Sequence, residues 1–184
     1  MLPPRSWRVL TAALLAATLG LTLSPAGATS SLRDDGTITG ADGVEYPRAP
    51  GAVQGRSGDL FDGYTFDIIC SDGGAGLTSD IKRLGKLAKL IERSGRTVAF
   101  TVVPPKALVN VENVVRGRLP HGRCDKKGLD QQRAVYDSYA DPRFIRLRQM
   151  LEQDKRQMFW KTDPHWTTLG AFHLVREIAE RVAL

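Results

Sequence analysis

The chain has 184 residues, of which 42% are hydrophobic and 25% charged, and its formal net charge is +6. This length allows one domain with a real core, and the absence of internal repeats and low-complexity tracts excludes repeat and fibrous proteins. The mild basicity fits an acidic glycan or an anionic surface as partner, and it fits an ordinary solvated surface equally well.

Residues 1–28 have the pattern of a secretory signal peptide. Arg5 and Arg8 form a basic start, Leu10 to Leu23 is an uncharged apolar run, and the segment ends in an A-x-A pattern at Ala28. The run is short for a membrane span, so we expect cleavage after Ala28 and a secreted or cell-envelope location, with an uncleaved anchor as the alternative. Residues 29–51 are rich in Gly, Asp, Ser and Pro and predict a flexible lead-in.

The next stretch predicts a hairpin followed by a strand. Residues 53–61 place two short apolar pieces around a glycine-containing turn, which is typical of a hairpin. Thr65 to Cys70 is a strand candidate that leads into Ser71-Asp72-Gly73-Gly74. A serine at the end of a strand is a candidate nucleophile, but the local order Cys-Ser-Asp-Gly favours a turn residue.

The middle of the chain predicts a helix and then a buried strand. Thr78 to Ser94 carries one apolar stripe and is followed by Gly95, which favours an amphipathic helix. Thr97 to Val103 is β-branched and aromatic, so we expect a buried central strand. Two prolines end it and place Lys106 at its carboxyl end, where Lys106 either contacts substrate or pins the loop.

Only two cysteines occur, Cys70 and Cys124. An isolated pair in an exported protein usually forms one disulfide, which we therefore predict. His121 and Cys124 are three positions apart and suggest a zinc site as the rival, but no second pair of soft ligands is near them in the sequence, so no metal is expected.

The last third predicts three helices and one strand. The helices are a short one at Leu129 to Tyr139, one that starts at Pro142, and one at Thr168 to Val182, with an apolar strand at Met158 to Trp160 before the last. Strands and helices thus alternate, which favours an α/β fold with a mostly parallel sheet under flanking helices.

The polar turn after Trp160 holds the most reactive side chains. Pro164 pushes Asp163 into an extended conformation, and residues two apart in an extended backbone point to the same side. Asp163 and His165 can therefore share a pocket, where a carboxylate sets the tautomer of an imidazole and raises its basicity. An ordinary Asp-Pro-His turn before a helix is the alternative interpretation.

Thr162-Asp163-x-His165-Trp166-Thr167-x-x-Gly170-Ala171 resembles the signature of SGNH-hydrolase-like O-acetyltransferases of the AlgJ/AlgX type. The G-x-x-G-x-L-F and V-P-P-K patterns support the resemblance, which covers residues 52–184 as one SGNH-like domain. It implies a three-layer sandwich, and it makes Asp163 and His165 the acid and base of a Ser-His-Asp triad. Trp166 is a candidate to wall the pocket or stack on a sugar, and Lys106 is a candidate substrate contact.

The same resemblance implies a polysaccharide substrate and a membrane-bound acyltransferase as the acetyl donor. We expect no cofactor, no metal and no nucleic acid. In the family the nucleophile follows in a later Gly-x-Ser elbow, and no such elbow follows His165 here. Three explanations compete. The sequence is the front of a longer enzyme with the rest of the sheet missing, it is an inactive glycan-binding or accessory protein, or Ser71 serves as the nucleophile of an esterase.

Overall fold

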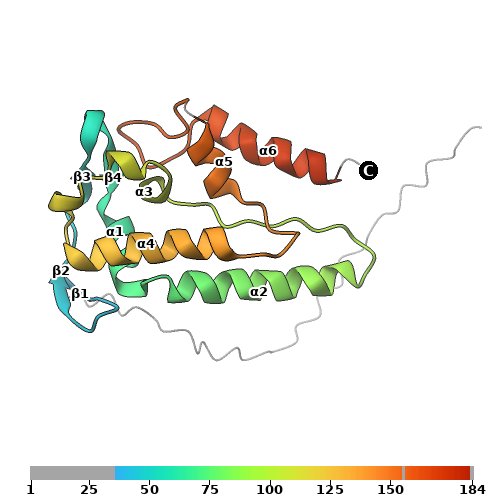
Figure 1. The fold of residues 1–184 in the computed structure, drawn as a ribbon, viewed down its shortest axis with the longest axis horizontal. Coiled ribbons are helices and arrows are strands. Elements are labelled where there is room, and N and C mark those ends of the chain that lie inside the picture. The colour runs from blue at the N-terminus through green and yellow to red at the C-terminus, as the bar shows by residue number, and fades with distance from the viewer. Residues whose placement is uncertain (1–35, 155, 183–184) are drawn as a thin grey trace, which may run out of the picture.

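A computed structural model describes residues 36–154 and 156–182 of the chain (Figure 1), so the predicted signal peptide lies outside the described residues. The strands are β1 (Thr37–Thr39), β2 (Glu45–Pro47), β3 (Ala52–Gln54) and β4 (Leu60–Asp62). The α-helices are α1 (Gly63–Asp72), α2 (Ala75–Glu92), α3 (Lys106–Val109), α4 (Arg123–Ser138), α5 (Leu147–Gln153) and α6 (Thr168–Val182). Short 3₁₀ turns occupy Arg56–Gly58, Val111–Asn113 and Arg116–Arg118.

The helices form most of the body of the molecule. Figure 1 shows α2 and α4 alongside each other, with α6 on the opposite side and α5 between. α1 packs most extensively on α4, and α3 contacts both α4 and α5. No helix of the described part has both the length and the apolar character needed to cross a bilayer.

Two antiparallel hairpins lie at one end of this body. In the second, Val53 lies opposite Phe61, which confirms the hairpin predicted at residues 53–61. The first hairpin, β1–β2, lies inside the segment predicted to be a flexible lead-in. Its turn is held by Asp42, which accepts hydrogen bonds from the Val44 amide at 3.1 Å and the Tyr46 hydroxyl at 2.8 Å. A hairpin held by such local polar contacts has no apolar periodicity in its sequence, which is why the sequence pattern did not predict it.

The mixed helix and strand content agrees with the predicted class, but the mostly parallel sheet is not confirmed. In the described residues both strand ladders are antiparallel, and parallel pairing is limited to a bridge between Phe100 and Phe144. The buried central strand predicted at Thr97 to Val103 is wrong, because among the described residues this segment pairs only through the backbone of Phe100 and the hydroxyl of Thr101. The side chain of Val103 is 50% exposed. A β-branched composition shows that a segment is compatible with a β-sheet. It does not show that neighbouring strands are present to pair with it.

The strand predicted at Thr65 to Cys70 is also wrong, since these residues lie in α1. The carboxylate of Asp62 caps the helix by accepting from the Tyr64 amide at 3.3 Å and the Thr65 hydroxyl at 3.2 Å. Phe66, Ile69 and Cys70 recur at helical spacing and are buried. The helix ends at Gly73, whose φ of 55° favours glycine.

The predicted helices are present with shifted ends. α2 starts three residues before the predicted Thr78, because Asp72 accepts from the amides of Gly74 and Gly76. The helix predicted from Leu129 begins earlier, at Arg123, and the last helix has the predicted bounds. The helix predicted from Pro142 begins later, at Leu147 of α5, because Phe144 and Ile145 pair with Phe100 instead.

A disulfide joins Cys70 of α1 to Cys124 of α4, with the two Cα atoms 5.1 Å apart. This pairing was predicted and is confirmed. The disulfide packs against buried Ile38 of β1, so the first hairpin contacts α1 and α4 at the point where the two helices are joined. A loop of 54 residues is closed by the bond.

A buried histidine lies next to the disulfide. His121 places Nδ1 2.8 Å from Asp125 Oδ1, and Nε2 3.1 Å from the Pro47 carbonyl and 3.2 Å from Asp67 Oδ1. Burial lowers the pKa of His121, but the hydrogen bond with Asp125 and the charges of Asp125 and Asp67 outweigh it and raise the pKa. Cys70, His121 and Asp125 bring ligand-type atoms within 4.8 Å of one another, but the sulfur of Cys70 is bonded in the disulfide and is not a thiolate.

The raised pKa of His121 predicts a pH dependence of stability. The protonated imidazole stabilises the fold fully below its unfolded pKa of about 6.5, and this contribution is lost as the pH rises through the higher folded-state pKa. Urea unfolding from about pH 5 to pH 9 should therefore show a fall in the free energy of unfolding through the folded-state pKa. In His121→Gln this fall should flatten, whereas the exposed-site control His165→Gln should keep it. A wild-type free energy that is constant across this range would contradict the prediction.

Candidate functional site

The turn that holds Asp163 and His165 is closed by a short antiparallel pairing. Phe159 bridges to Trp166, the Thr167 amide donates to the Met158 carbonyl at 2.8 Å, and the Trp160 amide donates to the His165 carbonyl at 3.1 Å. The predicted strand before the turn is therefore reduced to this bridge. The pairing brings both ends of the turn together and presents its tip to solvent.

At the tip, the side chains of Asp163 and His165 are hydrogen-bonded to each other. Oδ1 of Asp163 lies 2.6 Å from His165 Nδ1 and accepts from the His165 amide at 2.7 Å. The side chains are 50% and 80% exposed, respectively. The amide of His165 lowers the pKa of Asp163 most, followed by its imidazole, and the charge of Lys106 adds a smaller effect.

This geometry defines what the pair can do chemically. An ionised carboxylate at Nδ1 selects the tautomer with its proton on Nδ1, and leaves the Nε2 lone pair free. Nε2 can then accept a proton from a hydroxyl, and the carboxylate steadies the imidazolium that results. The arrangement suits a general base.

The residues after the pair fix the start of α6. The Thr167 hydroxyl donates to the Gln157 carbonyl at 2.9 Å and accepts from the Gly170 amide at 3.2 Å, as an N-terminal cap does. A Cβ on Gly170 would lie 2.5 Å from the Met158 carbonyl oxygen and 3.0 Å from Trp166 Cβ. Trp166 is half-buried and packs against the core cluster of Met158 and Phe159. The T-x-x-G part of the motif is therefore explained by close packing.

Gly170→Ala should destabilise the protein by about 1–3 kcal/mol, because the methyl group meets backbone that must shift. Gly117→Ala is the matched control, since a Cβ there has nothing within 4 Å. Urea unfolding of both variants checks the difference. Equal free energies of unfolding for the two variants would show that the backbone at the start of α6 accommodates the added methyl group without loss of stability.

Lys106, predicted as a substrate contact or a loop anchor, is the first residue of α3 and is buried. Its ammonium donates to the carbonyls of Trp160 at 2.7 Å, Lys161 at 2.8 Å and Leu60 at 3.0 Å. It also lies 2.8 Å from Asp59 Oδ1. The structure thus brings Lys106 to the base of the Asp163–His165 turn.

Ser71, the alternative nucleophile, is not part of this arrangement. It lies in the last turn of α1, where its hydroxyl donates to the Ile68 carbonyl at 3.4 Å. No hydrogen bond between residues 36 and 182 joins it to Asp163 or His165. The turn predicted at Ser71 begins instead at Gly73.

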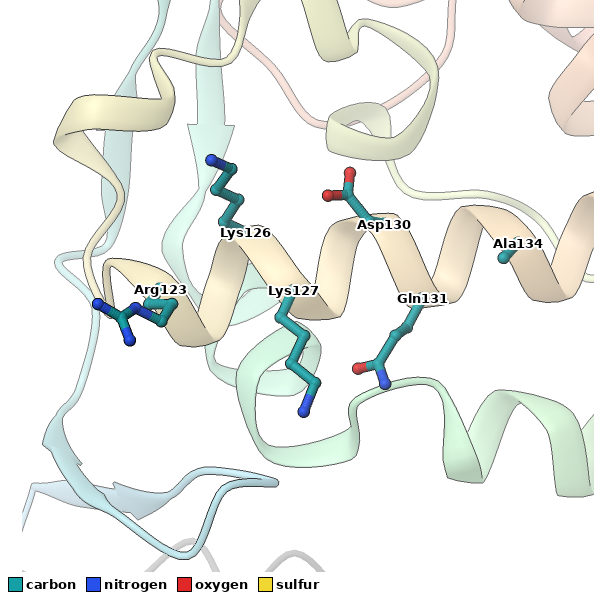
Figure 2. A pocket seen from close by; sticks show the side chains of 6 residues that line it. All are labelled: Arg123, Lys126, Lys127, Asp130, Gln131 and Ala134. Atoms are coloured by element: carbon teal, nitrogen blue, oxygen red, sulfur yellow. The ribbon is translucent and has the colours of Figure 1, made fainter.

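A surface hollow of about 620 Å³ lies elsewhere, along α4. Its lining residues are Arg123, Lys126, Lys127, Asp130, Gln131 and Ala134. In Figure 2, Lys126 and Asp130 project to one side of the helix and Lys127 and Gln131 to the other, so the polar ends diverge. A reactive site needs converging groups, and the side chains that line this hollow do not converge.

A family model described as "SGNH hydrolase-like domain, acetyltransferase AlgX" matches residues 52–184. The chain belongs to this family. No match is found among curated proteins or among solved structures. The AlgX-type domain starts with the β3–β4 hairpin and contains Lys106, Asp163 and His165, whereas the β1–β2 hairpin precedes it.

Sequence reasoning missed two residues of the AlgX-type domain that support the turn. Asp59 is buried against Lys106, and its other oxygen accepts from Asn113 Nδ2 at 2.5 Å. Asn113 is 54 residues away from Asp59 in sequence, and no local pattern encodes such a contact. The available signal was a lone acid between Gly58 and the apolar Leu60-Phe61, which is also typical of a solvated turn.

Proposed function

We propose that this protein takes part in O-acetylation of an exported polysaccharide, with Asp163 and His165 as the acid/base pair of a Ser-His-Asp acyl transfer. The observation that carries the proposal is the 2.6 Å contact between Asp163 Oδ1 and His165 Nδ1 on an exposed turn. Membership of an acetyltransferase family gives that contact its chemical meaning. The polysaccharide acceptor comes from the family resemblance.

The reaction would proceed in two transfers. Nε2 of His165 takes the proton of a serine hydroxyl while the serine oxygen attacks the acetyl carbonyl, and the donor leaves with that proton. Nε2 then takes the proton of a sugar hydroxyl, whose oxygen attacks the acetyl-serine and restores the serine. In both steps Asp163 holds the ring at Nδ1 and stabilises the imidazolium.

The nucleophilic serine belongs, in this proposal, to polypeptide other than the described residues. Support comes from His165, whose imidazole is hydrogen-bonded only to Asp163 within the described residues. Ser71 already donates its hydroxyl within α1. The proposal includes an extracytoplasmic location with residues 1–28 as the signal peptide, and a membrane-bound acyltransferase as acetyl donor.

The test is the O-acetyl content of exported polysaccharide in cells that produce this protein. Deletion of the gene should remove most base-labile acetyl groups, and the wild-type gene on a plasmid should restore them. Unchanged acetyl content after deletion would refute the proposed function.

The basic surface of α4 favours a second candidate, a non-catalytic glycan-binding role. Arg123, Lys126 and Lys127 are exposed on α4 and point in different directions, so each would contact a separate carboxylate group of an acidic glycan. Charge reversal of all three should then abolish retention on an immobilised acidic polysaccharide, whereas His165→Ala should not. If wild type and variant are both retained weakly and salt abolishes the retention of both equally, the basic residues of α4 are simply solvent-exposed and bind no glycan.

A further inference from the structure

The ammonium of Lys106, at the start of α3, meets two other segments of the chain. Its four oxygen partners come from Asp59 and Leu60 at the start of β4, and from Trp160 and Lys161 at the base of the Asp163–His165 turn. The residue is only 3% exposed. A buried ammonium is costly unless it is paired and hydrogen-bonded, so this convergence is a specific arrangement.

The contacts leave Lys106 nothing with which to bind a substrate. An ammonium has three N–H donors, and four oxygens lie within 3.0 Å of this one. Asp59 neutralises the charge, and Asn113 occupies the second oxygen of Asp59. The Phe61 ring lies below the ammonium, with its centroid 5.2 Å away. All N–H donors of the Lys106 ammonium are therefore used by contacts within the protein.

Two of the three carbonyls that Lys106 binds, those of Trp160 and Lys161, lie at the base of the Asp163–His165 turn. Trp160 also pairs with His165 across the turn, and the Leu60 amide donates to the Lys161 carbonyl at 2.7 Å. The side chains of Asp163 and His165 are exposed, and among the described residues each side chain is hydrogen-bonded only within this pair of residues. Their placement thus depends on the base of the turn.

We propose that Lys106 is a positioning residue of the acyl-transfer site, which fixes the Asp163–His165 turn through the backbone carbonyls of Trp160 and Lys161. The inference rests on the proposed function of that pair. The inference means that the position of His165 Nε2 depends on the buried ammonium of Lys106, although that ammonium does not contact the substrate. A displacement of a catalytic group by about 1 Å can cost a hundredfold in rate.

Lys106→Met tests this inference, because it keeps the apolar stem and removes the donors. The ¹⁵N resonances of the His165 ring should shift from one tautomer toward a mixture, and O-acetylation in cells should fall about 10- to 100-fold. Arg133→Met is the matched control. Arg133 binds the Leu108 carbonyl of α3 and Glu152 but does not touch the turn, so it should leave the His165 spectrum unchanged.

Should Lys106→Met fail to fold, the double variant Asp59→Asn/Lys106→Met removes the unpaired buried carboxylate and provides the same readout. A folded variant with the wild-type tautomer signature overturns the inference, whatever happens to acetylation. An altered signature in a protein whose deletion leaves acetylation unchanged supports the positioning and rejects the proposed function. The two failures are therefore distinguishable.

Discussion

His165→Ala should lower the rate of polysaccharide O-acetylation by about a thousandfold or more, because acyl transfer loses its base in both steps. Asp163→Asn should cause a loss of similar order, since the amide no longer fixes the proton on Nδ1 through a charge. The measurement is the O-acetyl content of polysaccharide from a gene-deletion strain that carries each variant on a plasmid. Equal protein levels are verified by immunoblotting.

Ser71→Ala is the control for this experiment, and it should restore acetylation to the wild-type level. Its hydroxyl serves only the Ile68 carbonyl among its described contacts, so its removal costs little. The purified chain should also hydrolyse an activated acetyl ester slowly, with or without Ser71. Robust hydrolysis that Ser71→Ala abolishes would reject this view and make Ser71 the nucleophile of an esterase.

The second large effect concerns the disulfide. Cys70→Ala/Cys124→Ala should lower the free energy of unfolding by about 4 kcal/mol, because a closed loop of 54 residues restricts the unfolded chain. In a domain of this size the loss corresponds to a fall in Tm of about 10 °C. Thermal unfolding followed by circular dichroism measures it.

Reduction of the wild-type protein provides an independent check, since reductant should move its Tm toward that of the double alanine variant. Reductant should leave the variant itself unchanged. A wild-type Tm that is insensitive to reductant, with both thiols shown by alkylation to be free, would mean that the bond contributes nothing.

Local patterns predicted the helices better than the strands. The last helix was predicted with its correct bounds, because its apolar residues recur at 3.6-residue spacing and a threonine precedes it. Thr65 to Cys70 was mistaken for a strand because Ile68 and Ile69 favour β-structure, while the decisive capping contact of Asp62 lies outside that run. For Thr97 to Val103 the composition was suitable, but strand formation also needs neighbours that composition does not reveal.

The candidate site shows the same limit. The Asp163–His165 contact was predictable, since Pro164 restricts two neighbouring residues and the geometry is local. The disulfide was predictable because only two cysteines exist. The partners of Lys106 are 46 to 55 residues away in sequence and are mostly backbone carbonyls, which carry no side-chain signature at all.

The extended segment beside Phe144 has a practical consequence for anyone who purifies this protein. Phe100 directs both its amide and its carbonyl to residues 143–145, so the alternate backbone groups of Ala99 and Thr101 face the other edge, and no described residue pairs with them there. Within the described residues this edge has no partner strand, and an edge without a partner is a template for self-association. Pro104 and Pro105 cut the edge short, as gatekeeper residues do. Aggregation at high concentration should therefore start from this segment, and a lysine in place of exposed Val103 should improve solubility.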